Sequence, residues 1–184
     1  MPSLKPTKGK LLIAEPFLGD PNFERSVVFF WGPKDRRKFW LVFYKNTPYF
    51  IQEIFEEPGG HNLPLYLGGP VEQNTLHFLH RLSFIEDAIP VGENLFWSGD
   101  FEQIISILNV GKITEQDIRF FVGYSGWSAG QLDDELKRDS WIVSDTDAAF
   151  IFDTPTDQFW RAVLRRMGGE YRVKSHYPTD PRLN

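Results

Sequence analysis

The stretch that decides the fold is GYSGWSAGQLDDEL, residues 123–136, which joins an apolar strand to a helix through small residues and one tryptophan. The preceding run, residues 118–122, predicts the strand. Leu132 and Leu136 recur at helical spacing and predict an amphipathic helix over residues 129–138. Ser128 precedes this helix and Gln131 follows three residues later, which is the pattern of an N-cap with a capping box.

The same stretch contains a literal G-x-S-x-G motif at residues 126–130, placed between strand and helix as in the nucleophile elbow of serine hydrolases. Ser128 would be the nucleophile, and the remaining triad members would come from Asp145, Asp147 or Asp153 together with His176. Against this, His176 lies in an aperiodic tail, and the chain lacks the series of βα units that supports such an elbow. The capping role explains Ser128 fully, so we expect no catalytic residue and keep the hydrolase as the alternative.

Length and composition set the outer limits. The chain has 184 residues, a net charge of −5 and no cysteine. This predicts one domain over residues 1–184, with an N-terminal extension at 1–8 and an irregular C-terminal tail at 170–184. The missing cysteines exclude disulfides, thiolate nucleophiles and sulfur-ligated zinc. Because the net charge is negative, nucleic-acid binding is not supported globally and would need a local basic patch.

The order of predicted elements indicates an α+β protein with a largely antiparallel or mixed sheet. Strands are predicted over residues 11–14, 26–31, 39–44, 63–67, 75–82, 95–97, 118–122, 141–144 and 149–152. Helices are predicted over residues 49–57, 101–109, 129–138 and from 154 until Gly168-Gly169. The runs at 26–31 and 39–44 are expected to pair antiparallel across the charged loop between them.

The sequence contains no pattern typical of a metal site, a cofactor site or a membrane-spanning segment. His77 and His80 lie three apart on a predicted strand and would point to opposite faces, so we expect no metal site. No phosphate-binding glycine motif occurs, and we expect no cofactor. No run approaches a membrane span or the apolar core of a signal peptide, so we expect a soluble, cytoplasmic protein.

Two basic clusters are candidates for phosphate contact. They are Arg161, Arg165 and Arg166 on the last predicted helix, and residues 36–38 in the charged loop. The simpler interpretation of the helix arginines is that they complement its negative C-terminal end. We favour that interpretation and keep a nucleic-acid-binding regulator as a third hypothesis.

The longer pattern resembles the bacterial YqgE/AlgH family. The matching features, in order, are Leu12-Ile13-Ala14, Pro16, Asp20, Phe23, Arg25-Ser26-Val27-Val28, Asn46-x-Pro48, Gly68-Gly69-Pro70-Val71, Leu79-His80, Gly123-Tyr124-Ser125-Gly126-Trp127, Gly130-Gln131-Leu132, Glu135, Trp141, Phe152-Asp153-Thr154-Pro155 and Trp160. The match spans about residues 9–169. It implies a bent sheet that closes into a pseudo-barrel with several flanking helices, and a cytosolic protein without established enzymatic activity. Some members are described as transcriptional regulators.

Two details bear on this resemblance. The family commonly has a histidine and a Gly-Ala-x-Gly-Leu turn where this chain has Trp31-Gly32-Pro33 and a charged loop up to Trp40, so the role of that turn is in doubt here. The family position matching Ser128 is often glycine, which cannot be a nucleophile.

Polar, aromatic and glycine residues of the pattern predict one ligand pocket. The candidates are Arg25, Asn46, Gly68, Gly69, Tyr124, Trp127, Gln131 and Glu135. The structural alternative is a network in which Arg25 and Glu135 form a partly buried ion pair. We therefore expect a non-enzymatic binding or regulatory protein whose partner is a small molecule or another protein.

Overall fold

The computed structural model describes residues 5–31, 38–42, 46–54, 62–111, 113–128 and 130–179, with side chains omitted for 38–42. The strands are β1 (Leu11–Ala14), β2 (Val27–Phe30), β3 (Lys38–Val42), β4 (Asn46–Phe50), β5 (Pro64–Leu67), β6 (Val71–His80), β7 (Ile89–Gly92), β8 (Leu95–Trp97), β9 (Ile118–Trp127) and β10 (Trp141–Ser144). The helices are α1 (Phe101–Asn109), α2 (Gln131–Lys137), α3 (Ala148–Asp153), α4 (Phe159–Met167) and α5 (Gly169–Lys174). Two short 3-10 turns are η1 (Ile51–Glu53) and η2 (Thr156–Gln158).

The strands form a mixed sheet in the order β10-β1-β2-β3-β9-β6-β8-β7. Strand β5 adds to β9 in parallel and carries β4 on its other side, whereas the other pairings are antiparallel. The predicted α+β class is confirmed. The pseudo-barrel is not formed, because the described strand path ends at β10 and β7 instead of returning on itself.

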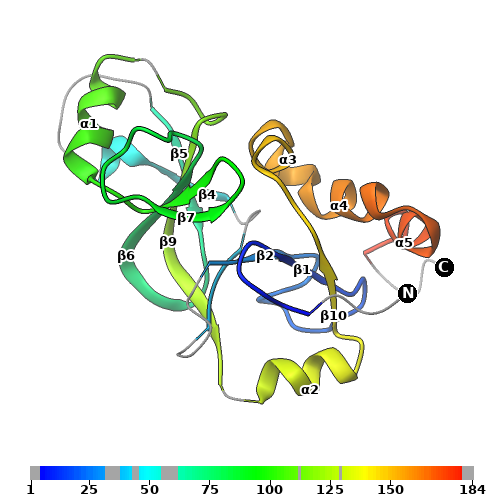
Figure 1. Ribbon diagram of the computed structural model, residues 1–184. Coiled ribbons are helices and arrows are strands. Elements are labelled where there is room, and N and C mark those ends of the chain that lie inside the picture. The colour runs from blue at the N-terminus through cyan, green and yellow to red at the C-terminus, as the bar shows by residue number, and fades with distance from the viewer. Residues whose placement is uncertain are drawn as a thin grey trace.

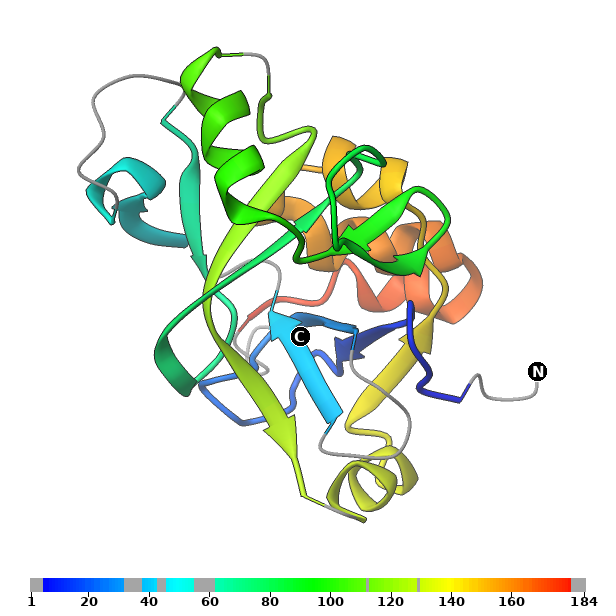
Figure 2. The ribbon, with the colours of Figure 1, turned by 60° about the vertical axis from the view of Figure 1, so that its left-hand side comes forward.

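Strand β9 connects the two ends of the molecule. In Figure 1 it runs from the region of α1 toward α2, while α3, α4 and α5 follow one another along one side. Figure 2 shows the same strand with α1 beyond its start and α2 at its foot. Its first half pairs with β5 and β6, and its last three residues pair with β3.

Strands β1 and β2 are buried on both faces, and their unbroken apolar runs suit that position. Leu11 and Ile13 join a core packed against α3 and α4, whereas Leu12 and Ala14 join a second core beneath α2. A third core lies between α1 and the start of β9. The site at α2 is thus built on a doubly covered, fully buried part of the sheet.

Several predicted elements match the structure and others need correction. The strand predicted at 149–152 is the helix α3, which begins after Asp147, whose carboxylate accepts from the Phe150 backbone N–H. A short apolar run fits both states, and the capping acid decides between them. The helix predicted at 49–57 is the end of β4 followed by η1, as far as residue 54, and residues 55–57 lie outside the described part.

The C-terminal region also differs from expectation. The last predicted helix begins with η2 and continues as α4, and the tail expected to be irregular starts with α5. Gly168 lies between α4 and α5 at φ 72°, a left-handed value that ends α4. The chain changes direction there, and α5 begins at the next residue. In the described residues, no helix is long and apolar enough to cross a membrane.

Candidate functional site

The start of α2 shows what Ser128 does. Its backbone N–H and its hydroxyl both donate to Gln131 Oε1, each at 3.1 Å. The N-cap is Gly130, at φ 82°, and not Ser128. One hydrogen bond of the predicted capping box therefore forms, from the Ser128 backbone N–H to the Gln131 side chain. The reverse bond, from a backbone N–H of the helix to the Ser128 hydroxyl, does not form, because the helix begins after Gly130 and Ser128 lies two residues before that N-cap.

The candidate triad acids have other partners. Asp145 pairs with Lys10, and Asp153 lies 3.5 Å from Arg81. Asp147 caps α3 and accepts from Arg166 at 2.5 Å, and these two hydrogen bonds lower the pKa of its carboxyl. Among the described contacts, the Ser128 hydroxyl is paired with Gln131 and not with a histidine.

The carboxylate of Glu135, on α2, lies at the centre of a polar cluster. Its Oε2 accepts from the indole Nε1 of Trp127 and of Trp141, each at 2.7 Å. Its Oε1 accepts from Gln131 Nε2 at 2.9 Å. Trp127 is the last residue of β9 and Trp141 the first of β10, so Glu135 ties together the strands on either side of α2.

Three aromatic rings pack on one another beside this carboxylate. Trp127 and Trp141 meet edge to face at 81°, and Phe23 lies 5.6 Å from each of them. They border a cavity of about 230 Å³ whose lining residues are Leu18, Asp20, Phe23, Gly126, Trp127, Gln131, Glu135, Ser140 and Trp141. The structure thus brings Trp127, Gln131 and Glu135 together around a cavity, as three members of one pocket.

The other predicted pocket residues lie elsewhere. Arg25 donates to the Tyr177 carbonyl at 2.7 Å and stacks over the Trp160 ring at 4.8 Å, toward α4 and α5. Asn46 accepts from the Thr156 hydroxyl at 3.4 Å on the exposed strand β4. Among the ion pairs of the described residues, Arg25 and Glu135 are not paired with each other.

Gly68 and Gly69 serve a close approach of backbones. The Gly68 N–H donates to the Val122 carbonyl, and a Cβ on Gly69 would overlap the backbone of Tyr124 and the hydroxyl of Ser125. The two glycines were predicted as residues of a ligand pocket. What they approach is strand β9 rather than a ligand.

Tyr124 belongs to another aromatic cluster, with His77, Trp31 and Trp97. Trp31 stacks on Trp97 at 3.9 Å, and Tyr124 meets the His77 ring edge on at 6.0 Å. Burial lowers the pKa of His77, and Glu72 partly opposes this. The cluster packs against the main core, so we assign Tyr124 a structural role.

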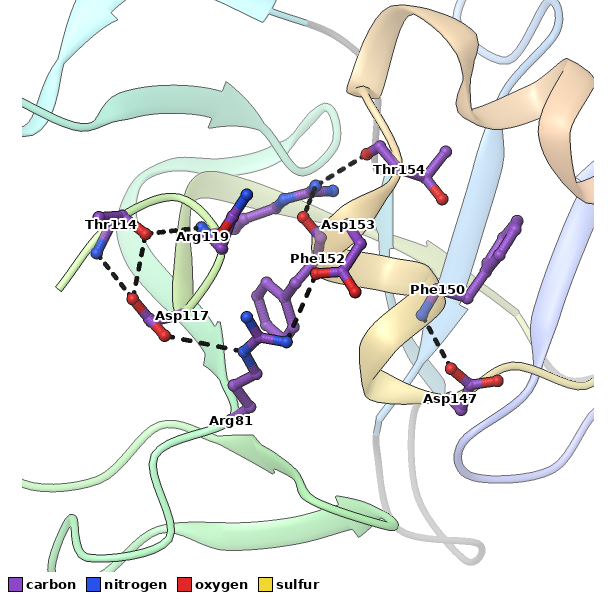
Figure 3. A network of polar contacts seen from close by, with 10 residues as sticks. Arg81, Thr114, Asp117, Arg119, Asp147, Phe150, Phe152, Asp153 and Thr154 are labelled. Atoms are coloured by element: carbon purple, nitrogen blue, oxygen red, sulfur yellow. Dashed lines mark hydrogen bonds and ion pairs between the residues drawn. The ribbon is translucent and has the colours of Figure 1, made fainter.

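A further polar network joins the start of β9 to α3, as Figure 3 shows. Arg81 lies between Asp117, at 3.7 Å, and Asp153, at 3.5 Å. Arg119 Nη2 donates to the carbonyls of Phe152, at 3.4 Å, and Thr154, at 3.0 Å. Burial lowers the pKa of the Arg119 guanidinium, and nearby Tyr66, Glu115 and Asp153 oppose this.

The two histidines considered as metal ligands are apart. His80 is buried, with its Nδ1 accepting from the Leu82 N–H and its Nε2 directed at the Ser98 carbonyl. His77 joins the Trp31 cluster on the other face of β6. Within the described ranges, no group of three or more metal-ligating side chains is assembled.

With the site described, the chain can be compared with known proteins. The model of the family described as AlgH-like (DUF179) matches residues 11–172. The chain belongs to the AlgH-like family. Relatives called UPF0301 protein include one from Cytophaga hutchinsonii, which is 43% identical to this chain over 180 residues. The aligned residues cover 97% of this chain and 99% of the relative. Another, from Bacteroides thetaiotaomicron, is 39% identical over 97% of this chain and 92% of the relative.

Two solved structures of similar fold cover nearly the whole AlgH-like chain. The solution structure of AlgH from Pseudomonas aeruginosa superposes with a TM-score of 0.72 at 26% identity, over 97% of this chain and 98% of that one. The crystal structure of DIP2367 from Corynebacterium diphtheriae gives a TM-score of 0.79 at 21% identity, over 96% and 95%. The latter likeness shows a shared fold.

Sequence reasoning missed Asp20, Phe23, Ser140 and Trp141 as parts of the cavity. Phe23 and Asp20 lie more than 100 positions before Trp127, and only the sheet brings them together. Trp141 had one local signal. It opens the strand after α2, as Trp127 closes the strand before it, so both tryptophans flank the helix that carries Glu135.

Proposed function

We propose that this AlgH-like chain is a non-enzymatic binding protein that recognises a small ligand in the cavity beside α2. The observation that carries the proposal is the carboxylate of Glu135, which two indole N–H groups and one amide hold in place at the cavity wall. Three donors on one carboxylate leave it little freedom to move. A preorganised polar group among aromatic rings is the usual composition of a ligand site.

The contacts of Ser128, the candidate nucleophile, support binding rather than catalysis. Ser128 is exposed and its hydroxyl donates to Gln131, an amide that cannot act as a base. A nucleophilic serine needs a base within hydrogen-bond reach. We place the binding function in the cytoplasm.

The test uses the indole N–H resonances of the full-length chain in two-dimensional NMR spectra. A set of charged, neutral and aromatic small molecules is added to the 15N-labelled protein. We expect compounds that bind to shift the indole signals of Trp127 and Trp141. The indole of Trp160, which donates to the Ala14 carbonyl in the core, is the internal control and should not move.

A matched variant checks the location. Trp127→Phe keeps a ring in the core but removes one donor to Glu135, so ligand shifts at Trp141 should weaken. Asp133→Asn changes an exposed residue of the same helix and should leave them intact. A screen in which neither indole responds, or in which Trp160 responds equally, would contradict the proposal.

Transcriptional regulation through direct DNA contact is the second candidate. It is favoured by the exposed Arg161 and Arg165 on α4, although Arg166 is already paired with Asp147. Fluorescence anisotropy with labelled duplex DNA at low salt tests it. Binding that falls with salt and is lost when Arg161 and Arg165 become glutamine would support this function, and no binding at low salt would remove it.

A further inference from the structure

We propose that His80 is a proton-operated clamp on residues 82–98, a stretch that we call the hairpin segment because it contains β7 and β8. The neutral ring holds this segment closed, and protonation releases the end at Leu82. Three features carry the proposal: the hydrogen bonds of the ring, the short attachment of the segment to the sheet, and the apolar side chains that the segment covers. It concerns a movement of the fold and is independent of the cavity beside α2.

The imidazole of His80 bonds both ends of the hairpin segment. Its Nδ1 accepts from the Leu82 backbone N–H at 3.2 Å, and its Nε2 lies 2.8 Å from the Ser98 carbonyl oxygen. Leu82 is the first residue of the segment and Ser98 is the last. Because a backbone N–H only donates and a carbonyl only accepts, these contacts require a ring with its proton on Nε2 and none on Nδ1.

Protonation removes one of these two contacts. An imidazolium carries an N–H on both nitrogens. The new Nδ1–H would meet the Leu82 N–H, donor against donor, while the bond to the Ser98 carbonyl would persist. Burial lowers the pKa of His80, and the hydrogen bond with the Ser98 carbonyl opposes this. The Leu82 end is therefore the end that opens in acid.

The hairpin segment is joined to the sheet by a short ladder. Among the described pairs of β6 and β8, Leu79 lies opposite Trp97 and His80 lies opposite Phe96. The Ser98 N–H extends this ladder by donating to the Phe78 carbonyl at 3.0 Å. Strand β7 stands at the end of the described strand path. One of the two sheet pairs thus contains the titrating residue itself.

Two backbone conformations in the hairpin segment are unfavourable. Asp87 lies at φ 56° and Ser98 at φ 57°, in the left-handed region that side chains disfavour. Such conformations persist where surrounding contacts enforce them. His80 supplies one of these contacts, because its ring bonds the carbonyl of Ser98.

The Leu82 end of the segment covers the core beneath α1. Leu82 and Ile85 are 9% and 5% exposed and belong to that core. Glu86 links this end to α1, since its N–H donates to Gln103 Oε1 at 3.0 Å. Figures 1 and 2 both show β7 beside α1. Release of Leu82 would uncover apolar side chains next to Phe84, which is already 62% exposed.

Other titratable and charged groups lie on the elements around His80. They are His77 and Arg81 at β6, Asp117 and Arg119 at the start of β9, Glu86 and Asp87 in the hairpin segment, and Asp100 and Glu102 at the start of α1. Arg81 is paired with Asp117, and Asp100 accepts from the Gln103 backbone N–H. His77 is the residue to separate by experiment, because burial lowers its pKa too and its ring stacks on Trp97 at 5.3 Å.

Hydrogen–deuterium exchange of the full chain tests the clamp at about pH 7.5, 6.5 and 5.5, with protection corrected for the intrinsic exchange rate at each pH. The opened ring titrates near the ordinary value of about 6.5, and one proton changes an equilibrium by at most about tenfold per pH unit. We therefore expect protection over residues 82–98 to fall about three- to tenfold between the highest and the lowest pH. Helix α4 is the internal reference and should keep its protection.

Two glutamine variants locate the titrating residue. In His80→Gln, an amide that does not titrate can accept from Leu82 and donate to Ser98, so the acid response should shrink to less than about twofold. His77→Gln is the matched control on the other face of β6, and it should keep the wild-type response.

The 15N signals of the His80 ring in the wild-type protein need no variant, so they keep the test valid if His80→Gln does not fold. We expect a bare Nδ1 and a protonated Nε2 at neutral pH. Both nitrogens should become protonated over the pH range in which the hairpin segment opens.

Three results would overturn the proposal. The first is an acid response that persists in His80→Gln or disappears only in His77→Gln. The second is a proton on Nδ1 at neutral pH, which would contradict the hydrogen bond from Leu82. The third is an equal loss of protection in residues 82–98 and in α4, which would show global destabilisation without a local clamp.

Discussion

Strand β9 carries a buried polar side chain near each end, Arg119 at its start and Trp127 at its finish, and the ends differ in how these groups are paired. At the finish, Glu135 accepts from Trp127, Trp141 and Gln131, and each indole has its partner. At the start, Arg119 is 4% exposed and uses one nitrogen on two carbonyls, while its Nε and Nη1 are buried without a hydrogen-bond partner.

This difference in hydrogen bonding indicates which of the two buried polar groups stabilises the fold. A buried donor without a partner costs about 1–3 kcal/mol, whereas a satisfied pair contributes a modest net gain. The Glu135 cluster holds α2 between β9 and β10 through three satisfied contacts. Arg119 holds α3 through two carbonyls, but its desolvated charge offsets much of that gain.

The largest expected effect comes from replacing each group with an apolar side chain. Glu135→Leu leaves the indole N–H groups of Trp127 and Trp141 without their acceptor, so we expect it to lower the free energy of unfolding by about 2–4 kcal/mol. Arg119→Met removes an incompletely paired charge, so we expect a change of less than about 1 kcal/mol. Urea denaturation of both variants measures the contrast.

The conservative variants sharpen this comparison. Glu135→Gln retains an acceptor oxygen and should recover most of the stability that Glu135→Leu loses. Arg119→Lys keeps the charge but loses the planar group that reaches two carbonyls, and should be less stable than Arg119→Met. Equal losses in Glu135→Leu and Arg119→Met would break the comparison between the two ends.

A smaller effect is expected midway along β9, where Gly69 packs against Tyr124. Gly69→Ala places a methyl group into the backbone of Tyr124, so we expect a loss of about 1–3 kcal/mol. Gly130→Ala is the matched control, because Gly130 also has positive φ but open space around its Cα. It should lose less than Gly69→Ala, because only the left-handed backbone, at about 1–2 kcal/mol, opposes its methyl group. Similar losses of stability in Gly69→Ala and Gly130→Ala would show that the positive φ at Gly69, and not its close contact with Tyr124, is what requires glycine there.

Acid should weaken the Arg119 end of the strand. His80 pairs with Ile118 across the sheet, and burial lowers its pKa below the ordinary value of about 6.5. The neutral ring is favoured in the folded state, so stability is complete above the ordinary pKa and falls as pH drops below it. The slope is at most about 1.4 kcal/mol per pH unit for this residue.

Urea denaturation at a series of pH values from neutral to mildly acidic measures that slope. His77 contributes in the same direction, because burial lowers its pKa as well. His80→Gln should flatten the profile, because it removes the buried ring whose protonation the folded state opposes. A wild-type profile that rises toward acid would contradict the assignment.

The smallest effect is expected at Ser128, beside the Glu135 end. Its hydroxyl makes one exposed contact to Gln131, so Ser128→Ala should change stability by less than about 0.5 kcal/mol. It should also leave any turnover of a generic ester at the wild-type level. Hydrolysis that disappears in Ser128→Ala would establish the hydrolase and refute the binding proposal.

Local patterns predicted most elements near β9 and fewer at the C-terminus. The strand before Trp127 and the helix carrying Leu132 follow from periodicity, although the strand continues through Trp127 itself. Periodicity failed at residues 149–152, since four apolar residues fit strand and helix equally and Asp147 made the choice. For the site, the family pattern supplied Trp127, Gln131 and Glu135 but grouped them with Arg25 and Asn46, which lie elsewhere.

By itself the sequence determined the α+β class, the existence of strands β1 and β2, and the amphipathic α2, because hydrophobic spacing acts within a few residues of the chain. It also gave the family through the order of short motifs. The tertiary structure alone decided that Phe23 and Trp141 meet Trp127 around Glu135, that the sheet stays open, and that Arg119 lies under α3. These contacts join residues far apart in the chain, and their energies depend on burial and partners that no local pattern contains.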